Sequence, residues 1–285
     1  MIKIIKYFFE SLIIYLFFFI IKLIGLSISR TLFSLIFKKI GPIIKSSNTI
    51  KKNLNIFSNK ISEQKKREIE LNMWSNYGKT FVEYMFLKKF RKENLHINIE
   101  GKKILDEISH NNKPVIFVSG HFANFELMSM EITKNKINLA TIYRPLNNFF
   151  LNPLMEYLRK KYVCNKQIKK GRSGIKECIE YIEKGCSVAL MIDQRLGEGD
   201  RVKFFNKKAH TTSLPAQLSL KYNLNIVPIF IEREHKDSFK MKIYEPINTS
   251  NFNNKSELTL KLNQILENMI LENPNQWIWT HDRWK

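Results

Sequence analysis

A chain of 285 residues is long enough to bury one substantial hydrophobic core, and its middle contains no stretch typical of a linker between two cores. Its 47 Lys and Arg residues against 26 Asp and Glu residues give a formal charge of +21. The expected partner is therefore anionic: a nucleic acid, an acidic membrane surface, or an acidic protein or substrate. Cys164, Cys178 and Cys186 have neither metal-ligand spacing nor a CxxC motif, which argues for a reducing compartment and against a disulfide framework.

Residues 1–45 are predicted to anchor the chain to a membrane. Residues 7–27 are apolar apart from Glu10 and Lys22, and a helix of this length reaches about 30 Å, the thickness of the hydrocarbon core of a bilayer. Residues 30–45 keep apolar side chains on one side and offer basic ones on the other, as an interfacial amphipathic helix does. The segment can therefore span the bilayer or lie half-sunk in it. A cleaved signal peptide, for which no clear cleavage site follows, and a buried core hairpin are the alternatives.

Residues 46–285 are predicted to form one α/β domain. A helical pattern over residues 50–92 comes first, and after it short apolar runs rich in β-branched residues alternate with amphipathic helical stretches. Strands without polar alternation are typical of a sheet covered on both faces, so this order predicts a mixed, largely parallel central sheet flanked by helices. The expected strands are 114–119, 139–144, 187–193 and 226–232, with an edge strand at 239–247, and the expected helices are 152–162, 174–185, 214–224 and 256–272.

The first of these strands leads into the candidate catalytic residues His121 and Glu126. In open α/β sheets, ligands bind at the carboxyl ends of strands, where the chain turns into a helix. A spacing of five does not place two residues on one face of a continuous helix, so the pair can meet only if His121 lies in the turn before the helix, with Gly120 allowing the bend. The carboxylate would then accept the imidazole N–H and leave the other nitrogen free as a general base. Because no nucleophile accompanies the pair, the hydroxyl of a substrate could supply it.

An isolated H-x4-E pattern more often has a structural explanation. The histidine then caps the helix and the glutamate complements the positive end of the helix dipole. Here the pair follows a buried strand directly, in a chain with a membrane-seeking first segment, and further polar residues follow later strands. This context favours the catalytic interpretation.

Four more polar residues are predicted to bind substrate. Arg144 ends a predicted strand, and its forked guanidinium suits a phosphate or a developing oxyanion; the alternative is a surface arginine paired with a nearby acid. Arg172 opens a helix from a basic loop with two glycines, where it could cradle a phosphate or belong to an ordinary glycine turn. Asp193 and Gln194 end another strand. We expect Asp193 to pair with one of the two arginines, against the alternative of a structural strand-end aspartate.

The stretch "HFANFE", residues 121–126, resembles the H-x4-E motif of the lipid A biosynthesis acyltransferase family, the late lauroyl and myristoyl transferases of Gram-negative bacteria. The likeness covers nearly the whole chain in order, including the apolar first segment. Ala123, where the family often has glycine, and Asp282, in a usually more basic segment, depart from the pattern. The likeness to the family continues through "YRPLNNFFLNPLMEYLRKKY", "GRSGIKECIEYIEKG", "ALMIDQRLGEGDRVKFFNKKAHTT", "LPAQLSLKYNLNIVPIFIER" and "NPNQWIWTHDRWK".

The resemblance implies a glycerol-phosphate-acyltransferase-like fold and transfer of a fatty acyl chain from an acyl carrier protein thioester to a hydroxyl of a lipid A precursor. His121 would remove the hydroxyl proton and Glu126 would hold the imidazole ring. No metal or other cofactor is expected. The implied partners are acyl carrier protein, the anionic lipid A precursor and the inner membrane, with no nucleic acid. If the apolar segment spans the membrane, the larger cluster of Lys and Arg lies after it, and the positive-inside rule then predicts that the catalytic domain is on the cytoplasmic side.

Two alternative functions remain at this point. An enzyme of the same type could acylate another membrane lipid, such as a glycerol phosphate, a phosphatidylinositol mannoside or an ornithine lipid. A membrane-tethered basic protein that binds nucleic acid belongs to a different class. Against it, the positive charge is dispersed along the chain, and no motif of a nucleic-acid reader appears.

Overall fold

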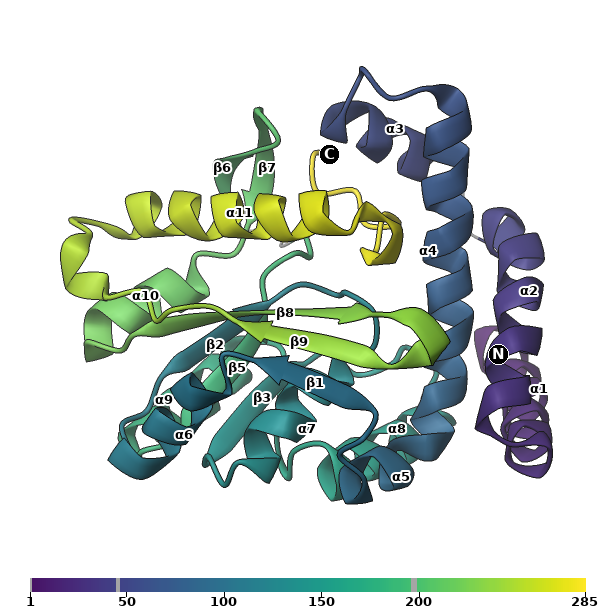
Figure 1. The fold of residues 1–285 in the computed structure, drawn as a ribbon, viewed down its shortest axis with the longest axis horizontal. Coiled ribbons are helices and arrows are strands. Elements are labelled where there is room, and N and C mark those ends of the chain that lie inside the picture. The colour runs from purple at the N-terminus through teal and green to yellow at the C-terminus, as the bar shows by residue number, and fades with distance from the viewer. Residues whose placement is uncertain (1, 45–46, 196–198) are drawn as a thin grey trace.

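The protein is built around a seven-stranded, mostly parallel sheet, which confirms the predicted α/β fold (Figure 1). The computed structural model describes residues 2–44, 47–195 and 199–285. Neighbouring strands are parallel except for the antiparallel pair β8 and β9. The strand order is β1 (Ile97–Glu100), β9 (Phe239–Ile243), β8 (Ile226–Arg233), β2 (Ile116–Ser119), β5 (Ser187–Met191), β3 (Leu139–Tyr143) and β4 (Lys166–Lys169).

The strands predicted from continuous apolar runs are the central ones of the sheet. All four residues of β2 are buried, and β8 is buried along nearly its whole length. The strand expected at the edge of the sheet, residues 239–247, is β9 and is not an edge strand, because β1 pairs with it on the side away from β8. The sequence did not predict the actual edge strands β1 and β4, because each has only four residues and lacks a continuous buried run. It also did not predict the separate antiparallel hairpin of β6 (Asp200–Phe204) and β7 (Lys207–Thr211).

Helices cover both sides of the sheet, as predicted. Figure 1 shows α11 on one side and α6, α7 and α9 on the other. The predicted helices are present with slightly different ends. The helices that follow the first sheet strand are α6 (Lys102–Asn111), which was not predicted, and α7 (Glu126–Lys134), α8 (Asn152–Tyr162), α9 (Arg172–Glu183), α10 (Leu214–Tyr222) and α11 (Lys255–Glu272).

The single helical pattern expected over residues 50–92 is divided into several elements. They are α3 (Ser47–Phe57), α4 (Glu63–Glu83), the 3-10 helix η1 (Tyr84–Phe86) and α5 (Leu87–Lys92). The first break has a local cause. Ser62 is the N-cap of α4, and its side-chain oxygen accepts the backbone N–H of Lys65 at 3.2 Å, so the chain leaves one helix and starts another there.

Two N-terminal helices lie beside α4 at one edge of the molecule (Figure 1). They are α1 (Ile2–Ile24), which is long and apolar enough to cross a membrane, and α2 (Leu26–Ile44). A Cβ atom on Gly78 of α4 would lie 2.3 Å from the backbone oxygen of Phe33 in α2. α2 and α4 therefore pack this closely only because residue 78 has no side chain.

A buried ion-pair cluster joins these helices to the sheet. The carboxylate of Glu83 in α4 is fully buried and accepts hydrogen bonds from Arg30 of α2, at 2.7 Å from its Nε, and from Arg233 of β8. The same carboxylate accepts the side-chain amide of Asn124 at 2.9 Å. Asn124 belongs to the turn between β2 and α7. Because an unpaired buried charge is costly, this cluster fixes the turn relative to α2, α4 and β8.

Candidate active site

The candidate catalytic residues lie where they were predicted in the chain: His121 is in the turn after β2, and Glu126 is the first residue of α7. Gly120 is needed for its small size. A Cβ atom there would lie 2.7 Å from the ring of Phe122 and 2.9 Å from Leu266. The close packing of this turn against α11 therefore requires glycine at residue 120.

The left-handed residue of the turn is Ala123, with a φ of 42°. Its backbone is held on both sides. The carbonyl oxygen accepts the hydroxyl of Thr80 at 3.0 Å and the amide of Asn76 at 3.4 Å, both from α4. Its N–H donates to the backbone oxygen of Gln276 at 3.3 Å. These contacts hold the uncommon backbone conformation that carries His121 at the edge of the sheet.

Asp193, which lies just beyond β5, orients the imidazole of His121. Nδ1 of His121 lies 2.7 Å from Oδ1 of Asp193, and the backbone N–H of His121 donates to Oδ2 at 2.7 Å. The indole N–H of Trp277 donates to the same Oδ2 at 2.9 Å. A carboxylate can only accept, so Nδ1 of His121 carries a proton and Nε2 keeps its lone pair.

The charge of Asp193 is maintained by these contacts. Burial alone would raise the pKa of Asp193, but the charge of His121 and the hydrogen bonds from its ring and backbone outweigh burial and lower the pKa to about 2. The carboxylate is fully buried, whereas the side chain of His121 is 15% exposed. The amide nitrogen of Gln194 lies 3.1 Å from Nε2 of His121 and donates to it. Of the three residues Asp193, His121 and Gln194, the histidine and Gln194 line the cavity, whereas Asp193 lies behind the imidazole ring.

Two predicted contacts are wrong. The described residues contain no hydrogen bond between His121 and Glu126, because Asp193 occupies the imidazole N–H that Glu126 was expected to accept. The expected ion pair of Asp193 with Arg144 or Arg172 is also absent from this part of the chain, because His121 and Trp277 occupy both carboxylate oxygens.

Glu126 instead forms a second cluster with Arg159 of α8 and Tyr84 of η1. Its Oε1 accepts hydrogen bonds from Nε of Arg159 at 2.8 Å and from the hydroxyl of Tyr84, and it lies 2.7 Å from Nη2 of Arg159 in the same ion pair. That hydroxyl in turn accepts Nη2 of Arg159 at 2.9 Å. Nη1 of Arg159 has no hydrogen-bond partner among the residues that the structure describes. Glu126 therefore positions Arg159 while the Nη1 group of this arginine stays available for a further hydrogen bond.

The protonation states in this second cluster are well defined. Burial raises the pKa of the Tyr84 phenol far above its usual range, and the carboxylate of Glu126 adds to this effect, so the phenol stays a donor. Burial would lower the pKa of Arg159, but the charges and hydrogen bonds of Glu126 and Tyr84 outweigh it and raise the pKa. Arg159 is therefore a fixed positive charge in the cavity wall.

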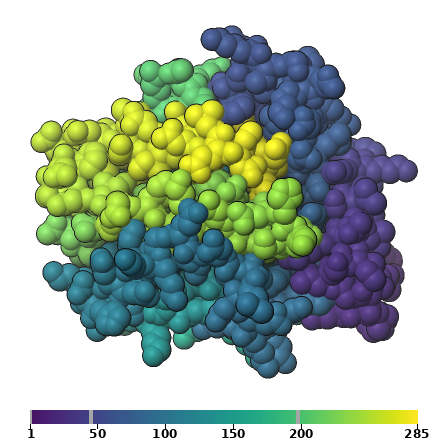
Figure 2. Space-filling view, in the orientation of Figure 1, coloured from purple at the N-terminus to yellow at the C-terminus, as the bar shows by residue number. Residues whose placement is uncertain are grey.

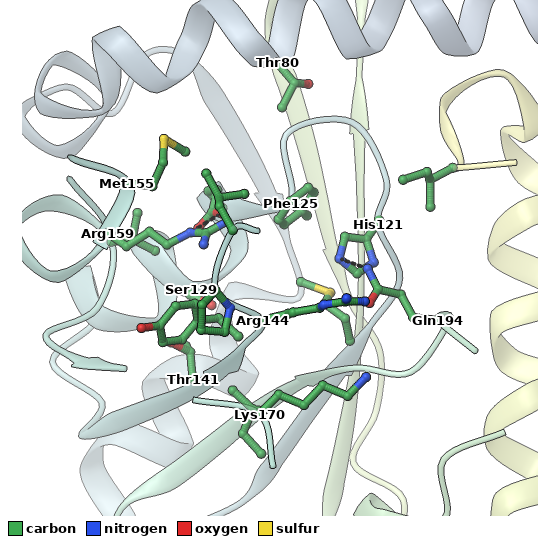
Figure 3. Close-up of a pocket in the computed structure, with 18 of the residues that line it drawn as sticks. Thr80, His121, Phe125, Ser129, Thr141, Arg144, Met155, Arg159, Lys170 and Gln194 are labelled. Carbon is green, nitrogen blue, oxygen red and sulfur yellow. Dashed lines mark hydrogen bonds and ion pairs between the residues drawn. The ribbon is translucent and has the colours of Figure 1, made fainter. Parts of the chain in front are cut away.

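Both clusters line one cavity of about 1130 Å³ (Figure 3). This volume is at the upper end of the range for small-molecule sites and suits a long ligand. Its wall is mixed. The polar part carries His121, Glu126, Arg159 and Gln194, and the apolar part includes residues of α1, α2 and α4, among them Ile14, Phe18, Phe37 and Phe81.

Three more cations lie in the wall of the cavity: Arg144 after β3, Lys170 after β4, and Arg172, the first residue of α9. In Figure 3 the side chain of Arg144 is directed toward the side of the cavity that carries Gln194. Burial and the charge of Arg144 lower the pKa of Lys170. No carboxylate forms an ion pair with any of the three in the described ranges. The structure thus brings both predicted arginines together at one unneutralised positive wall.

Three residues of the site were missed in the sequence. Arg159 and Tyr84 lie within helical patterns and have no local signal of a functional role. Trp277 stands in a segment with three tryptophans, which marks it as unusual but does not connect it to Asp193, 84 residues earlier. No group of three His, Cys, Asp or Glu side chains that could hold a metal ion occurs in the described part of the chain.

Fold and site together define an α/β protein with a histidine at the carboxyl ends of parallel strands, a buried carboxylate that orients the imidazole, and a large, partly apolar cavity. The family model described as "Bacterial lipid A biosynthesis acyltransferase" matches residues 2–285. The chain belongs to this family, which confirms the resemblance seen in the sequence.

Individual relatives are distant. The chain is 23% identical over 197 residues to lipid A biosynthesis acyltransferase 2 of Shigella flexneri, a match that covers 67% of this chain and 61% of that protein. It is 21% identical over 250 residues to the lipid A biosynthesis lauroyltransferase of Escherichia coli (strain K12), covering 85% and 79%. It is 24% identical over 252 residues to the lipid A biosynthesis palmitoleoyltransferase of the same strain, covering 86% and 80%. The match thus spans less than two thirds of the Shigella protein.

Proposed function

We propose that this protein transfers a fatty acyl chain from an acyl carrier protein thioester to a hydroxyl group of a lipid A precursor, at the cytoplasmic face of the inner membrane. One observation carries the proposal: Nδ1 of His121 is bound to the buried carboxylate of Asp193, which leaves the basic Nε2 facing a cavity of about 1130 Å³. Membership of the lipid A acyltransferase family supports the choice of acceptor.

The chemistry needs one base and no enzyme nucleophile. Nε2 of His121 removes the proton from the acceptor hydroxyl as its oxygen attacks the thioester carbonyl. Gln194 now donates to this nitrogen at 3.1 Å, so the acceptor hydroxyl would take the place of its amide. The tetrahedral intermediate then collapses with loss of the thiolate, which takes the proton from the imidazolium. Asp193 holds the ring and stabilises its positive form throughout, so it is a positioning residue.

Glu126 is assigned a role different from that expected from the sequence. Its hydrogen bonds fix Arg159, a permanent positive charge whose Nη1 is free among the described residues. Such a preorganised donor would stabilise the negative charge that develops on the carbonyl oxygen of the thioester. Glu126 would thus act through Arg159, while His121 is served by Asp193.

Arg144, Lys170 and Arg172 would bind the phosphate groups of the substrates. A lipid A precursor is anionic, and the prosthetic group of an acyl carrier protein is attached through a phosphate. Arginine suits phosphate because it presents paired donors, and the N-terminus of α9 adds backbone N–H groups. The apolar wall formed by Phe18, Phe37 and Phe81 would receive the acyl chain. The formal charge of +21 would favour encounter with both the acidic carrier protein and the anionic lipid.

The test is acyl transfer in vitro with purified protein, defined acyl chains on acyl carrier protein, and a purified lipid A precursor, followed by mass spectrometry of the product. We expect an ester-linked acyl product, and its loss in the His121→Ala variant. Parallel reactions with glycerol phosphate, phosphatidylinositol mannoside and ornithine lipid as acceptors test the alternative substrates. Efficient transfer to one of these and none to the lipid A precursor would refute the proposed acceptor.

A further inference from the structure

α1 is attached to the rest of the protein along most of its length. Near its start, the backbone oxygen of Tyr7 accepts the amide of Asn148 at 2.8 Å. Near its middle, the hydroxyl of Tyr15 donates to the backbone oxygen of Phe150 at 2.8 Å. Toward its end, Phe18 stacks on Phe81 of α4 with ring centroids 5.0 Å apart. These contacts come from the loop before α8 and from α4, both parts of the domain that carries the site.

The two sides of α1 differ sharply. Ser11, Phe18 and Ile21, spaced by seven and three residues, face the protein and are buried. The opposite side is fully apolar and exposed: Ile2, Phe9, Leu16 and Leu23 have exposed fractions of 86%, 59%, 56% and 69%. These four residues are seven apart, so they lie on one line along the helix, which is about 30 Å long from first to last.

The same apolar surface continues onto the loop of residues 146–150. The ring of Phe149 lies 6.2 Å from that of Tyr7, and the ring of Phe150 lies 5.6 Å from that of Phe8. Phe149 is itself 51% exposed. Figure 2 shows α1 and α2 at one edge of the molecule. We name the exposed line of α1 together with residues 146–150 the lipid-facing surface.

A transmembrane course does not fit these contacts. Between Tyr7 and Ile21 the helix rises by about 21 Å, most of the hydrocarbon thickness of a bilayer. If α1 crossed the membrane, the contacting parts of the domain would have to enter the hydrocarbon with it. Those parts line a cavity with several charged groups, among them Arg144 and Arg159. Burying such groups in lipid is costly.

We propose that α1 lies flat in one leaflet of the membrane, with its axis parallel to the bilayer plane, and that the loop of residues 146–150 enters the same leaflet beside it. The partner is a lipid surface with anionic headgroups. Apart from Arg30, which is buried and paired with Glu83, residues 2–44 carry five cations, among them Lys3, Lys6 and Lys22, against the single acid Glu10. An apolar line with cations beside it is the pattern of interfacial helices. The inference rests on the membrane location in the proposed function.

This arrangement has a consequence for the site. Glu10, Ile14 and Phe18 of α1 line the cavity that contains His121. One side of α1 thus meets lipid and the other forms a wall of the cavity. A lipid acceptor in the same leaflet would enter from the side, past α1, without leaving the membrane.

Depth measurements on four variants, each with one added cysteine, test the proposal. Ile2→Cys, Phe9→Cys, Leu16→Cys and Leu23→Cys would be labelled with a fluorescent bimane in the full-length protein, reconstituted in vesicles of phosphatidylethanolamine and phosphatidylglycerol. The native cysteines are buried and do not compete for label under native conditions. Phospholipids brominated near or far from the headgroup report depth by quenching. Leu271→Cys on α11 is the matched control, since Leu271 is 59% exposed, like Phe9.

A flat helix predicts the same shallow quenching profile at all four positions, and none at Leu271→Cys. Phe149→Cys should share that profile. Deep quenching at the middle two positions, with the end labels on opposite sides of the vesicle, would overturn the flat arrangement and leave the membrane location intact. Labels open to aqueous quencher throughout would refute the membrane location itself. Labels shielded from both the brominated lipids and the aqueous quencher would show that protein and not lipid covers this surface, and would overturn the proposal. The same cysteine variants made in a His121→Ala background should give the same quenching profiles, so the position of α1 is tested without any acyl transfer.

Discussion

Replacement of Asp193 by asparagine tests the hydrogen-bond arrangement that sets the tautomer of His121. Oδ2 of Asp193 accepts two N–H groups, from the backbone of His121 at 2.7 Å and from Trp277 at 2.9 Å. An asparagine must therefore place its oxygen there, because an NH₂ group would face two donors. Its NH₂ group then points at Nδ1 of His121. The imidazole has to accept at Nδ1 and carry its proton on Nε2, the nitrogen that faces the cavity.

The size of the effect follows from the loss of the base. With a proton on Nε2, His121 cannot take one from the acceptor hydroxyl. General base catalysis contributes about 10²–10⁴-fold, so kcat should fall by this factor, or about 3–5 kcal/mol of transition-state stabilisation. The KM values for both substrates should change little, because Asp193 is fully buried and does not line the cavity.

The assay combines kinetics with a direct view of the tautomer. Transfer from acyl carrier protein to the lipid A precursor gives kcat and KM for the native protein and for Asp193→Asn. Nitrogen-15 NMR of labelled histidine distinguishes Nδ1–H from Nε2–H and should report the change at His121. Thermal unfolding of the same samples separates a catalytic effect from loss of the fold.

A double-mutant cycle provides the control. Once His121 is alanine, Asp193→Asn should have no further effect on the residual rate, because the aspartate acts only through the imidazole. The reasoning is refuted if the folded Asp193→Asn protein keeps nearly full kcat, or if it lowers the rate equally with and without His121.

Three further predictions concern stability. The folded protein lowers the pKa of Asp193 from 3.8 to about 2, so this group contributes about 2 kcal/mol to the free energy of unfolding above pH 4, and the contribution is lost as the pH falls toward 2. Urea titrations of native protein and Asp193→Asn at matched pH values should show a stability difference that shrinks over this pH range. A difference that stays constant with pH would contradict the prediction. Glu83→Gln leaves the buried Arg30 without its ion-pair partner and leaves Arg233 with only Asp237, at 3.9 Å, and should cost about 3–5 kcal/mol of unfolding free energy. Glu68→Gln, whose partner Lys65 is exposed, should cost less than about 1 kcal/mol, and equal losses would argue against the buried cluster. Gly78→Ala favours the helical conformation of α4 by up to about 1 kcal/mol, but it places a Cβ atom 2.3 Å from the backbone oxygen of Phe33. The clash should push α2 away from α4 and lower Tm. An unchanged or higher Tm would show that the two helices separate without cost.

Much of the fold was predictable from local patterns. Continuous apolar runs placed the central strands β2, β3, β5 and β8, because a strand buried on both faces has no polar alternation. The short edge strands β1 and β4 were not predictable in this way, because their exposed positions break the run. The long helical pattern over residues 50–92 gave helix but not its breaks, since those depend on capping and on packing against α2.

By itself, the sequence determined that His121 lies after a buried strand, that Glu126 starts the next helix, and that the first helix is long and apolar enough to cross a membrane. The tertiary structure decided which carboxylate serves the histidine. β2 pairs with β5 in a parallel register that places Ser119 opposite Met191, so the residues two positions further on, His121 and Asp193, come together although they are 72 apart in the chain. Apolar periodicity is a local property and can place each strand. The order of strands in a sheet depends on contacts between distant segments, and the pairing of β2 with β5 places His121 beside Asp193. The packing of α7 beside α8 in turn pairs Glu126 with Arg159.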